Sequence, residues 1–146
     1  MNLIEENNCL VLVIDVQERL VASAFDGNIA DRVAKLVKGA RILEIPTVVS
    51  EQYPKGLGNT VKAVSENFSQ NTFVTEKTSF SLLREEGILD KIKSYGKKQV
   101  IICGIETHIC VYQTAVELIN AGFEVTVMTD GCSPASGWNG TETGTI

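Results

Sequence analysis

Short apolar runs alternate with amphipathic stretches along most of the chain. Residues 9–14 are continuously apolar and are followed by Asp15, a pattern typical of a strand that is buried on both faces of a parallel sheet. Between 29 and 44, apolar residues recur at helical spacing, with charged residues on the other faces. The whole pattern predicts strands over 9–14, 46–50, 72–75, 99–103 and 124–129, and helices over 29–44, 60–67, 82–95 and 109–121.

The alternation of strands and helices predicts an α/β fold with a parallel sheet. The last stretch, 131–146, differs because it is rich in Gly, Ser and Thr and has no apolar periodicity. We therefore expect it to form a loop or tail. This divides the chain into a domain over 1–130 and an atypical tail over 131–146.

Composition narrows the classes of function. The chain has 146 residues, of which 44% are hydrophobic, and a net charge of −5. These values indicate one globular domain and disfavour a nucleic-acid partner. No apolar run approaches the ~20 residues that cross a bilayer, and no basic segment precedes the first apolar run. We therefore expect a cytoplasmic protein without a membrane partner, in which the cysteines are reduced thiols.

Candidate chemistry lies just after each predicted strand, because open α/β sheets bind ligands at the carboxyl ends of their strands. The residues at these positions are Asp15, Gln17, Glu51, Gln52, Glu76, Lys77, His108, Cys110, Asp130 and Ser133. No phosphate-binding glycine loop follows the first strand, where the acidic segment 15–19 would repel a phosphate. A nucleotide-binding module is therefore disfavoured. The cysteines form no C-x-x-C pair and His108 is the only histidine, so we expect no metal site.

Cys110 falls in the first turn of the helix predicted over 109–121. The partial positive charge and the N–H groups at a helix start favour a thiolate, which predicts a lowered pKa and a reactive nucleophile. Position alone leaves open that Cys110 is a small core residue, that Asp15 is a structural ion-pair partner and that Lys77 is a solvated lysine. Together the three offer a thiol, a carboxylate that accepts its proton, and a cation. His108 would not face Cys110 on a helix.

Three sequence blocks carry a family resemblance: LVIDVQ at 12–17, EKTSFS at 76–81 and GIETHICV at 104–111. Each block accompanies the end of a predicted strand, and together they resemble the isochorismatase-like cysteine hydrolases. The segment 50–58 is most similar to the isochorismatase-domain-containing branch. The resemblance implies a three-layer αβα, Rossmann-like fold with a parallel sheet of order 3-2-1-4-5. The family continues with a last helix and a sixth strand that we expect this sequence to lack, so that oligomerisation covers the exposed surface.

The resemblance also implies roles for individual residues. Cys110 would be the nucleophile, Asp15 the general base, and Lys77 the cation that orients them. A cis peptide bond would join Ile105 to Glu106, and the amides of Glu106 and Cys110 would form an oxyanion hole. Substrate contacts would come from Gln17, Gln52 and Phe80.

The expected function is cysteine-dependent hydrolysis of a small amide or a related C–N or ester-type substrate through an acyl-enzyme. We expect no metal, because the single histidine leaves no Asp-x-His cluster of the kind that metal-dependent nicotinamidases have, and no cofactor. The wide apolar face of the helix after Cys110 favours a homo-oligomer of two or more copies. On this hypothesis Cys110 is the fastest thiol to be alkylated, it stays reactive below about pH 7, and Asp15→Asn weakens that reactivity. The alternative is a catalytically inactive oligomeric protein that acts in binding or as a scaffold.

Overall fold

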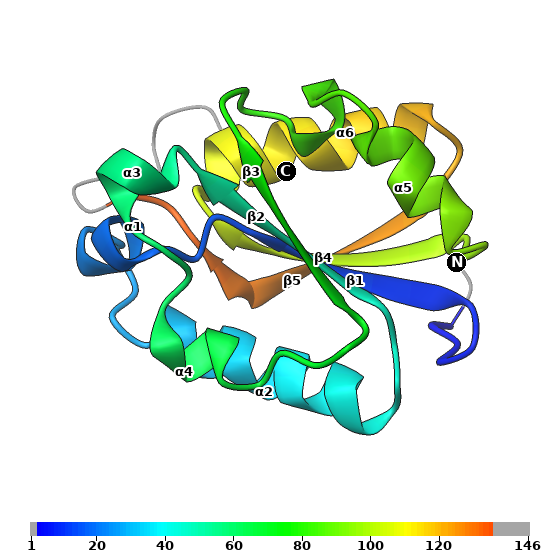
Figure 1. Cartoon of the computed structure of the whole chain (residues 1–146), viewed down its shortest axis with the longest axis horizontal. Coiled ribbons are helices and arrows are strands. Elements are labelled where there is room, and N and C mark those ends of the chain that lie inside the picture. Colours follow the sequence, from blue (N-terminus) through cyan, green and yellow to red (C-terminus); the bar gives the residue numbers. More distant parts are fainter. Residues whose placement is uncertain (1–2, 136–146) are drawn as a thin grey trace.

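The computed structural model describes residues 3–135, which form a five-stranded parallel sheet. The strand order is β3-β2-β1-β4-β5 (Figure 1), so the predicted fold class and order are confirmed. The strands are β1 (Cys9–Ile14), β2 (Thr47–Gln52), β3 (Thr72–Lys77), β4 (Gln99–Ile105) and β5 (Glu124–Ser133). Residues 136–146, which include most of the predicted tail, lie outside the described part of the chain.

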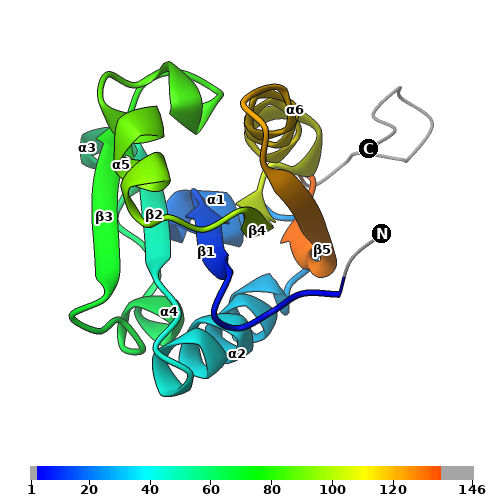
Figure 2. The same ribbon diagram turned by 90° about the vertical axis from the view of Figure 1, so that its right-hand side faces the viewer.

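Helices cover both faces of the sheet and make three layers. Figure 2 shows α2 (Ile29–Ile42) and α4 (Lys62–Ser65) below the sheet, and α5 (Ile88–Ser94) and α6 (Tyr112–Asn120) above it. Two short helices, α1 (Glu18–Ala22) and α3 (Pro54–Leu57), follow β1 and β2 at the carboxyl edge of the sheet. Among residues 3–135, no helix has the length and apolarity needed to cross a membrane.

The central strand β1 is apolar throughout because both of its faces are buried. Successive strand side chains point to opposite faces, so Val11 and Val13 pack in the cluster that includes α2. Leu10, Leu12 and Ile14 pack in the second cluster, with residues of α5 and α6. Burial on both sides thus fixes β1 as the middle of the fold and places its last residue at the centre of the carboxyl edge.

Three predicted helices differ from the structure. The helix predicted over 60–67 is only the four-residue α4. The helix predicted over 82–95 is divided into a 3₁₀ turn, Leu82–Arg84, and α5, because Gly87 has a φ of 78° that no α-helix accommodates. The helix predicted over 109–121 begins instead as a π-helical turn, Thr107–Val111, that leads into α6. The turn changes the local spacing of side chains around Cys110.

Most strands extend further than predicted. Polar residues at the ends of β2 and β3 still pair in register, Glu51 with Glu76 and Gln52 with Lys77, so backbone pairing continues beyond the apolar positions. Strand β5 likewise includes 131–133, where the sequence predicted the start of a loop or tail. The strand extensions bring Gln52 and Lys77 side by side at the carboxyl edge.

Candidate active site

Asp15, Lys77 and Cys110 meet at the carboxyl edge of the sheet. Asp15 directly follows β1 in a left-handed conformation (φ 53°), Lys77 is the last residue of β3, and Cys110 lies in the π-helical turn after β4. The Lys77 Nζ lies 2.9 Å from the Asp15 Oδ2, and both side chains are fully buried. The Cys110 thiol lies near enough to Asp15 for the carboxylate charge to raise its pKa, and only 8% of the residue is exposed. The three predicted catalytic residues therefore form one contact group.

The Asp15 carboxylate is held from two sides. Ser50 Oγ donates a 2.7 Å hydrogen bond to Oδ1, while Lys77 contacts Oδ2. Burial raises the pKa of Asp15, and the charge and hydrogen bonds of Lys77 together with the Ser50 bond partly oppose this rise. A carboxylate with a raised pKa accepts a proton more readily than an exposed one, which suits Asp15 to act as a base.

The Lys77 ammonium is fixed by oxygen atoms beyond Asp15. Nζ donates to Gln52 Oε1 at 2.7 Å, to the Ser79 carbonyl at 2.8 Å and to the Phe80 carbonyl at 3.0 Å. The carbonyls belong to the loop after β3, which folds back over the end of its own strand. Because its donors all point at oxygen atoms, this buried cation stays beside Asp15 without unpaired N–H groups.

Cys110 does not have the low pKa predicted from its place at a helix start. Burial, together with the negative charge of Asp15, raises the pKa of the Cys110 thiol to about 11, although the Lys77 ammonium acts in the opposite direction. Desolvation and the adjacent carboxylate thus outweigh the field of the helix end. At neutral pH the sulfur carries its proton, so reactivity below pH 7 is not expected. Attack by this sulfur requires a base, and Asp15 is the carboxylate whose charge acts on it.

The segment between β4 and the Cys110 turn comes very close to β1. Gly104 has a φ of 135°, and a Cβ at this position would lie 2.0 Å from the Ile14 carbonyl oxygen, so only glycine fits. The peptide bond between Ile105 and Glu106 is cis, as the family resemblance implies. The Glu106 carbonyl then accepts hydrogen bonds from the N–H groups of Ile109 and Val111, both at 3.2 Å.

The side chains of Gln17 and Gln52, which the resemblance suggested as substrate contacts, bond to the backbone and to Lys77. The Gln17 side chain is completely buried. Its Nε2 donates to the carbonyls of Gln52 (2.8 Å) and Gly58 (2.7 Å), and its Oε1 accepts from the Gln52 N–H at 2.6 Å. Gln52 in turn holds Lys77 and donates to the Thr78 carbonyl at 3.0 Å. The oxygen and nitrogen atoms of both side chains are thus already engaged by backbone groups and by Lys77.

Phe80 is the predicted substrate residue that presents its side chain to solvent. The residue is 55% exposed, while its carbonyl is turned toward Lys77. An exposed ring beside a buried polar group is a suitable contact for an apolar part of a ligand.

The sequence pattern did not point to three supporting residues: Ser50, Glu85 and Thr114. Glu85 Oε1 accepts from the N–H groups of Thr78 (2.8 Å) and Ser79 (3.0 Å), and these backbone bonds lower the pKa of Glu85. Glu85 thereby closes the loop whose carbonyls hold Lys77. For Thr114 a signal was present, because residues four apart on a helix are neighbours and Thr114 follows Cys110 at that spacing.

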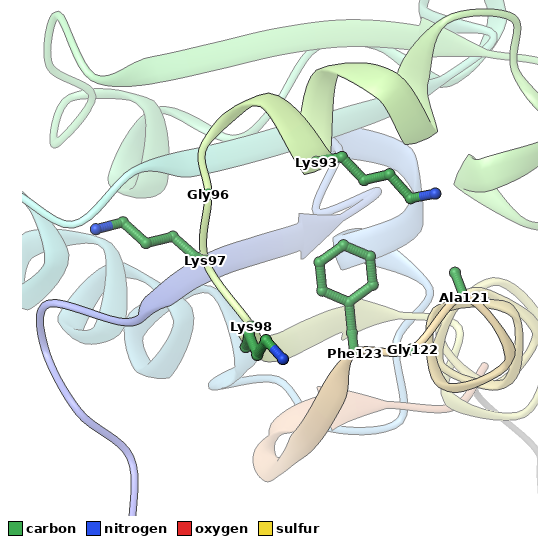
Figure 3. A pocket seen from close by; sticks show the side chains of 7 residues that line it. All are labelled: Lys93, Gly96, Lys97, Lys98, Ala121, Gly122 and Phe123. Atoms are coloured by element: carbon green, nitrogen blue, oxygen red, sulfur yellow. The ribbon is translucent and has the colours of Figure 1, made fainter.

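A separate cavity lies at the opposite, amino end of β4 and β5. It has a volume of about 300 Å³ and is lined by Lys93, Gly96, Lys97, Lys98, Ala121, Gly122 and Phe123 (Figure 3). Lysines beside the C-terminus of a helix such as α5 stabilise the helix dipole. Among residues 3–135, no group of three or more His, Cys, Asp or Glu side chains is placed to hold a metal ion.

The chain thus has a three-layer αβα, Rossmann-like fold with a buried polar group at the carboxyl edge of its sheet. The chain belongs to the isochorismatase family, since the Isochorismatase domain matches residues 9–141. It is 42% identical to isochorismatase domain-containing protein 1 of Salmo salar over 123 residues, which cover 84% of this chain and 43% of that protein. The chain thus spans less than half the length of this relative. The family predicted from the three sequence blocks is confirmed.

Two solved structures are similar over most of the chain. One is described as the MAR1 ribonuclease from Caenorhabditis elegans, with a TM-score of 0.83 and 38% identity over 92% of this chain and 69% of that one. The other is the YcaC gene product from Escherichia coli, described as an octameric hydrolase of unknown specificity. It has a TM-score of 0.85 and 26% identity over 91% of this chain and 67% of that one.

Proposed function

We propose that this chain is a cysteine-dependent hydrolase of a small amide or a related C–N or ester-type substrate. The observation that carries the proposal is the buried ion pair of Asp15 and Lys77 in contact with the Cys110 thiol. Burying a carboxylate and an ammonium is costly, and this pair lies beside a thiol at the carboxyl edge where such folds bind ligands. A structural ion pair alone would not need that sulfur.

The first half of the reaction forms an acyl-enzyme. Asp15 takes the proton of Cys110 while the sulfur attacks the carbonyl carbon of the substrate. The negative oxygen of the tetrahedral intermediate is held by the N–H groups of Glu106, just before the π-helical turn, and Cys110, within it. The first turn of a helix has N–H groups without a partner inside the helix. The C–N or C–O bond then breaks, and the leaving group takes the proton from Asp15.

The second half releases the acid. Asp15 takes a proton from a water molecule, whose oxygen attacks the thioester carbon. The C–S bond breaks, and the sulfur of Cys110 recovers the proton from Asp15. Throughout the cycle the Lys77 ammonium holds the carboxylate in place and balances its charge.

Two features favour a small uncharged carbonyl substrate over RNA, although one similar structure is described as a ribonuclease. The chain carries a net charge of −5, which repels a polyanion. The Lys77 ammonium is already taken by Asp15, Gln52 and two carbonyls, so it has no N–H left for a phosphate. We accordingly expect a small-molecule substrate and no nucleic-acid partner. We also expect a cytoplasmic protein, in which the cysteines are reduced thiols.

We also infer a homo-oligomer of two or more copies. One similar structure is described as octameric. On α6 of this chain, Tyr112, Val116 and Ile119 form an apolar row, and each residue is at least 36% exposed. A second copy would remove this row from water.

Hydrolysis of p-nitrophenyl acetate, followed by a panel of small amides, tests the proposed function. Cys110→Ala should abolish hydrolysis above background and remove the acyl adduct seen by intact-protein mass spectrometry. Cys9→Ala is the matched control, because Cys9 is a buried free thiol at the other end of β1 and should leave the rate unchanged. Hydrolysis that survives Cys110→Ala would overturn the proposal.

Two further results would also count against the proposal. No turnover of any carbonyl compound would favour the inactive binding or scaffold protein. Cleavage of an RNA oligonucleotide that depends on Cys110 would assign the site a different substrate.

A further inference from the structure

Thr114 is a buried polar residue that the reaction above does not use. It lies on α6, and its exposed fraction is 0%. Its Oγ1 donates to the Cys110 carbonyl at 2.6 Å and accepts from the Leu82 N–H at 3.1 Å. A threonine in a helix often bonds to the carbonyl four residues earlier. The second bond is unusual because it comes from a different element.

Leu82 connects Thr114 to the loop that holds Lys77. Leu82 begins the 3₁₀ turn after that loop, and the carbonyl of Phe80, two residues earlier, accepts from the Lys77 ammonium. The contacts therefore form a continuous path. It runs from the Cys110 carbonyl through Thr114, Leu82, Phe80 and Lys77 to Asp15, whose charge acts on the Cys110 thiol.

We propose that Thr114 is a positioning residue for the proposed reaction, because its hydroxyl joins the turn that carries the nucleophile to the loop that holds the cation. The proposal rests on the proposed function. One hydroxyl both accepts a hydrogen bond from the loop side and donates one to the turn. Through this hydroxyl, the distance between Cys110 and Lys77 is set by bonds on both sides of the site.

The same loop has a second link to α6 that is more exposed. Ser81 Oγ donates to Glu117 Oε2 at 3.1 Å, and Arg84 Nε donates to Glu117 Oε1 at 2.8 Å, but the Arg84 side chain is 68% exposed. Exposed ion pairs contribute little to stability, whereas a hydrogen bond shielded from water is stronger. Ser81 is itself buried, so its bond to Glu117 adds to the link, but only the Thr114 hydroxyl joins the loop directly to the backbone of the Cys110 turn.

The test is the rate of Cys110 alkylation by iodoacetamide as a function of pH, with the label assigned by peptide mass spectrometry. The Lys77 ammonium lowers the pKa of Cys110, so releasing the loop should raise that pKa. Thr114→Val, which has the same shape without the hydroxyl, should slow alkylation at about pH 9 by about tenfold, the change in thiolate fraction that one pKa unit produces. Thr114→Ser should keep the wild-type profile.

The direction of the change separates positioning from a merely structural role. A loosened fold would expose the thiol and speed its alkylation, so a Thr114→Val rate at or above that of the wild type would overturn the proposal. Thr47→Val is the matched control, since Thr47 is a buried threonine at the start of β2, with its hydroxyl on the Ile45 carbonyl. Circular dichroism checks that each variant is folded at the assay temperature.

A measurement on the unaltered protein covers the case in which Thr114→Val does not fold. The Leu82 N–H should exchange with solvent slowly, and fast exchange would overturn the proposal. Alkylation does not require turnover. Loss of Cys110-dependent hydrolysis would therefore reject the proposed function, whereas an unshifted alkylation profile would reject the role of Thr114.

Discussion

The Lys77 ammonium and the Asp15 carboxylate lie 2.9 Å apart, and both side chains are fully buried. The pair joins the end of the edge strand β3 to the end of the central strand β1, across β2. Removing two charges from water is costly, and their attraction offsets that cost only when the remaining polar atoms are also bonded. Ser50 on one side and Gln52 on the other supply such bonds.

Lys77→Met should strongly destabilise the protein, because it leaves the Asp15 carboxylate buried without its cation. Loss of one partner of a buried pair typically costs about 3–5 kcal/mol, and urea unfolding measures the change. The double variant Lys77→Met/Asp15→Asn, which carries neither charge, should recover part of the loss. Equal destabilisation in the single and double variants would show that the cost arises from packing and not from the unpaired carboxylate.

Asp15→Asn should change two properties of Cys110 in opposite directions. The carboxylate raises the pKa of Cys110 while the Lys77 ammonium lowers it. Removing the carboxylate should therefore lower that pKa and speed alkylation at neutral pH, which is the opposite of the effect expected from the sequence. Hydrolysis should fall by about 10²–10⁴-fold, the usual contribution of a general base. Iodoacetamide labelling and p-nitrophenyl acetate hydrolysis are measured on the same samples. Unchanged hydrolysis would contradict the assignment of Asp15 as the base, and slower alkylation would show that the carboxylate activates the thiol more than its charge raises the pKa.

The strands and the central place of β1 were predictable from local apolar runs, whereas the strand order came from the family resemblance. The apolar run of β1 indicates a central strand, and every residue of that strand is buried. The ends of other helices and strands could not be predicted as well from the sequence. Gly87 is tolerated in a helical pattern, and only its φ of 78° shows that the helix starts after it. Strand ends such as Gln52 are polar, so the hydropathy pattern does not show that backbone pairing continues beyond the apolar positions.

The site was predictable in position but not in electrostatics. Parallel strands end at one edge, so Asp15, Lys77 and Cys110 could be grouped from their places after β1, β3 and β4. The pKa of Cys110 could not be predicted, because it depends on burial and on contact with Asp15, which is distant in the sequence. The hydrogen bonds by which Gln17 and Thr114 support the site could not be predicted for the same reason, since their partners come from other elements.

The free energy of unfolding should decrease in alkaline solution, because buried thiols keep protons that the unfolded chain releases. The pKa of Cys110 and that of Cys132 are each raised from 9.0 to about 11, mainly by burial. Above about pH 9 the unfolded chain releases these protons while the folded chain keeps them, so the unfolding free energy falls as the pH rises toward 11. The urea midpoint should therefore decrease over this range and less steeply in Cys110→Ala/Cys132→Ala. Identical slopes in the wild type and the double variant would exclude Cys110 and Cys132 as the cause.

Two glycines should respond to alanine in opposite ways. At Gly104 the new Cβ would lie 2.0 Å from the Ile14 carbonyl oxygen, in a backbone conformation (φ 135°) that alanine disfavours. Gly104→Ala should therefore lose more stability than the ~1–3 kcal/mol typical of a strained backbone position, and it should displace the turn that carries Cys110. Gly39 lies inside α2, where an added Cβ would meet no atom within 4 Å, so Gly39→Ala should gain about 0.5–1 kcal/mol. Urea unfolding of the two variants beside the wild type measures both changes, and a neutral Gly104→Ala would show that β4 can move away from β1.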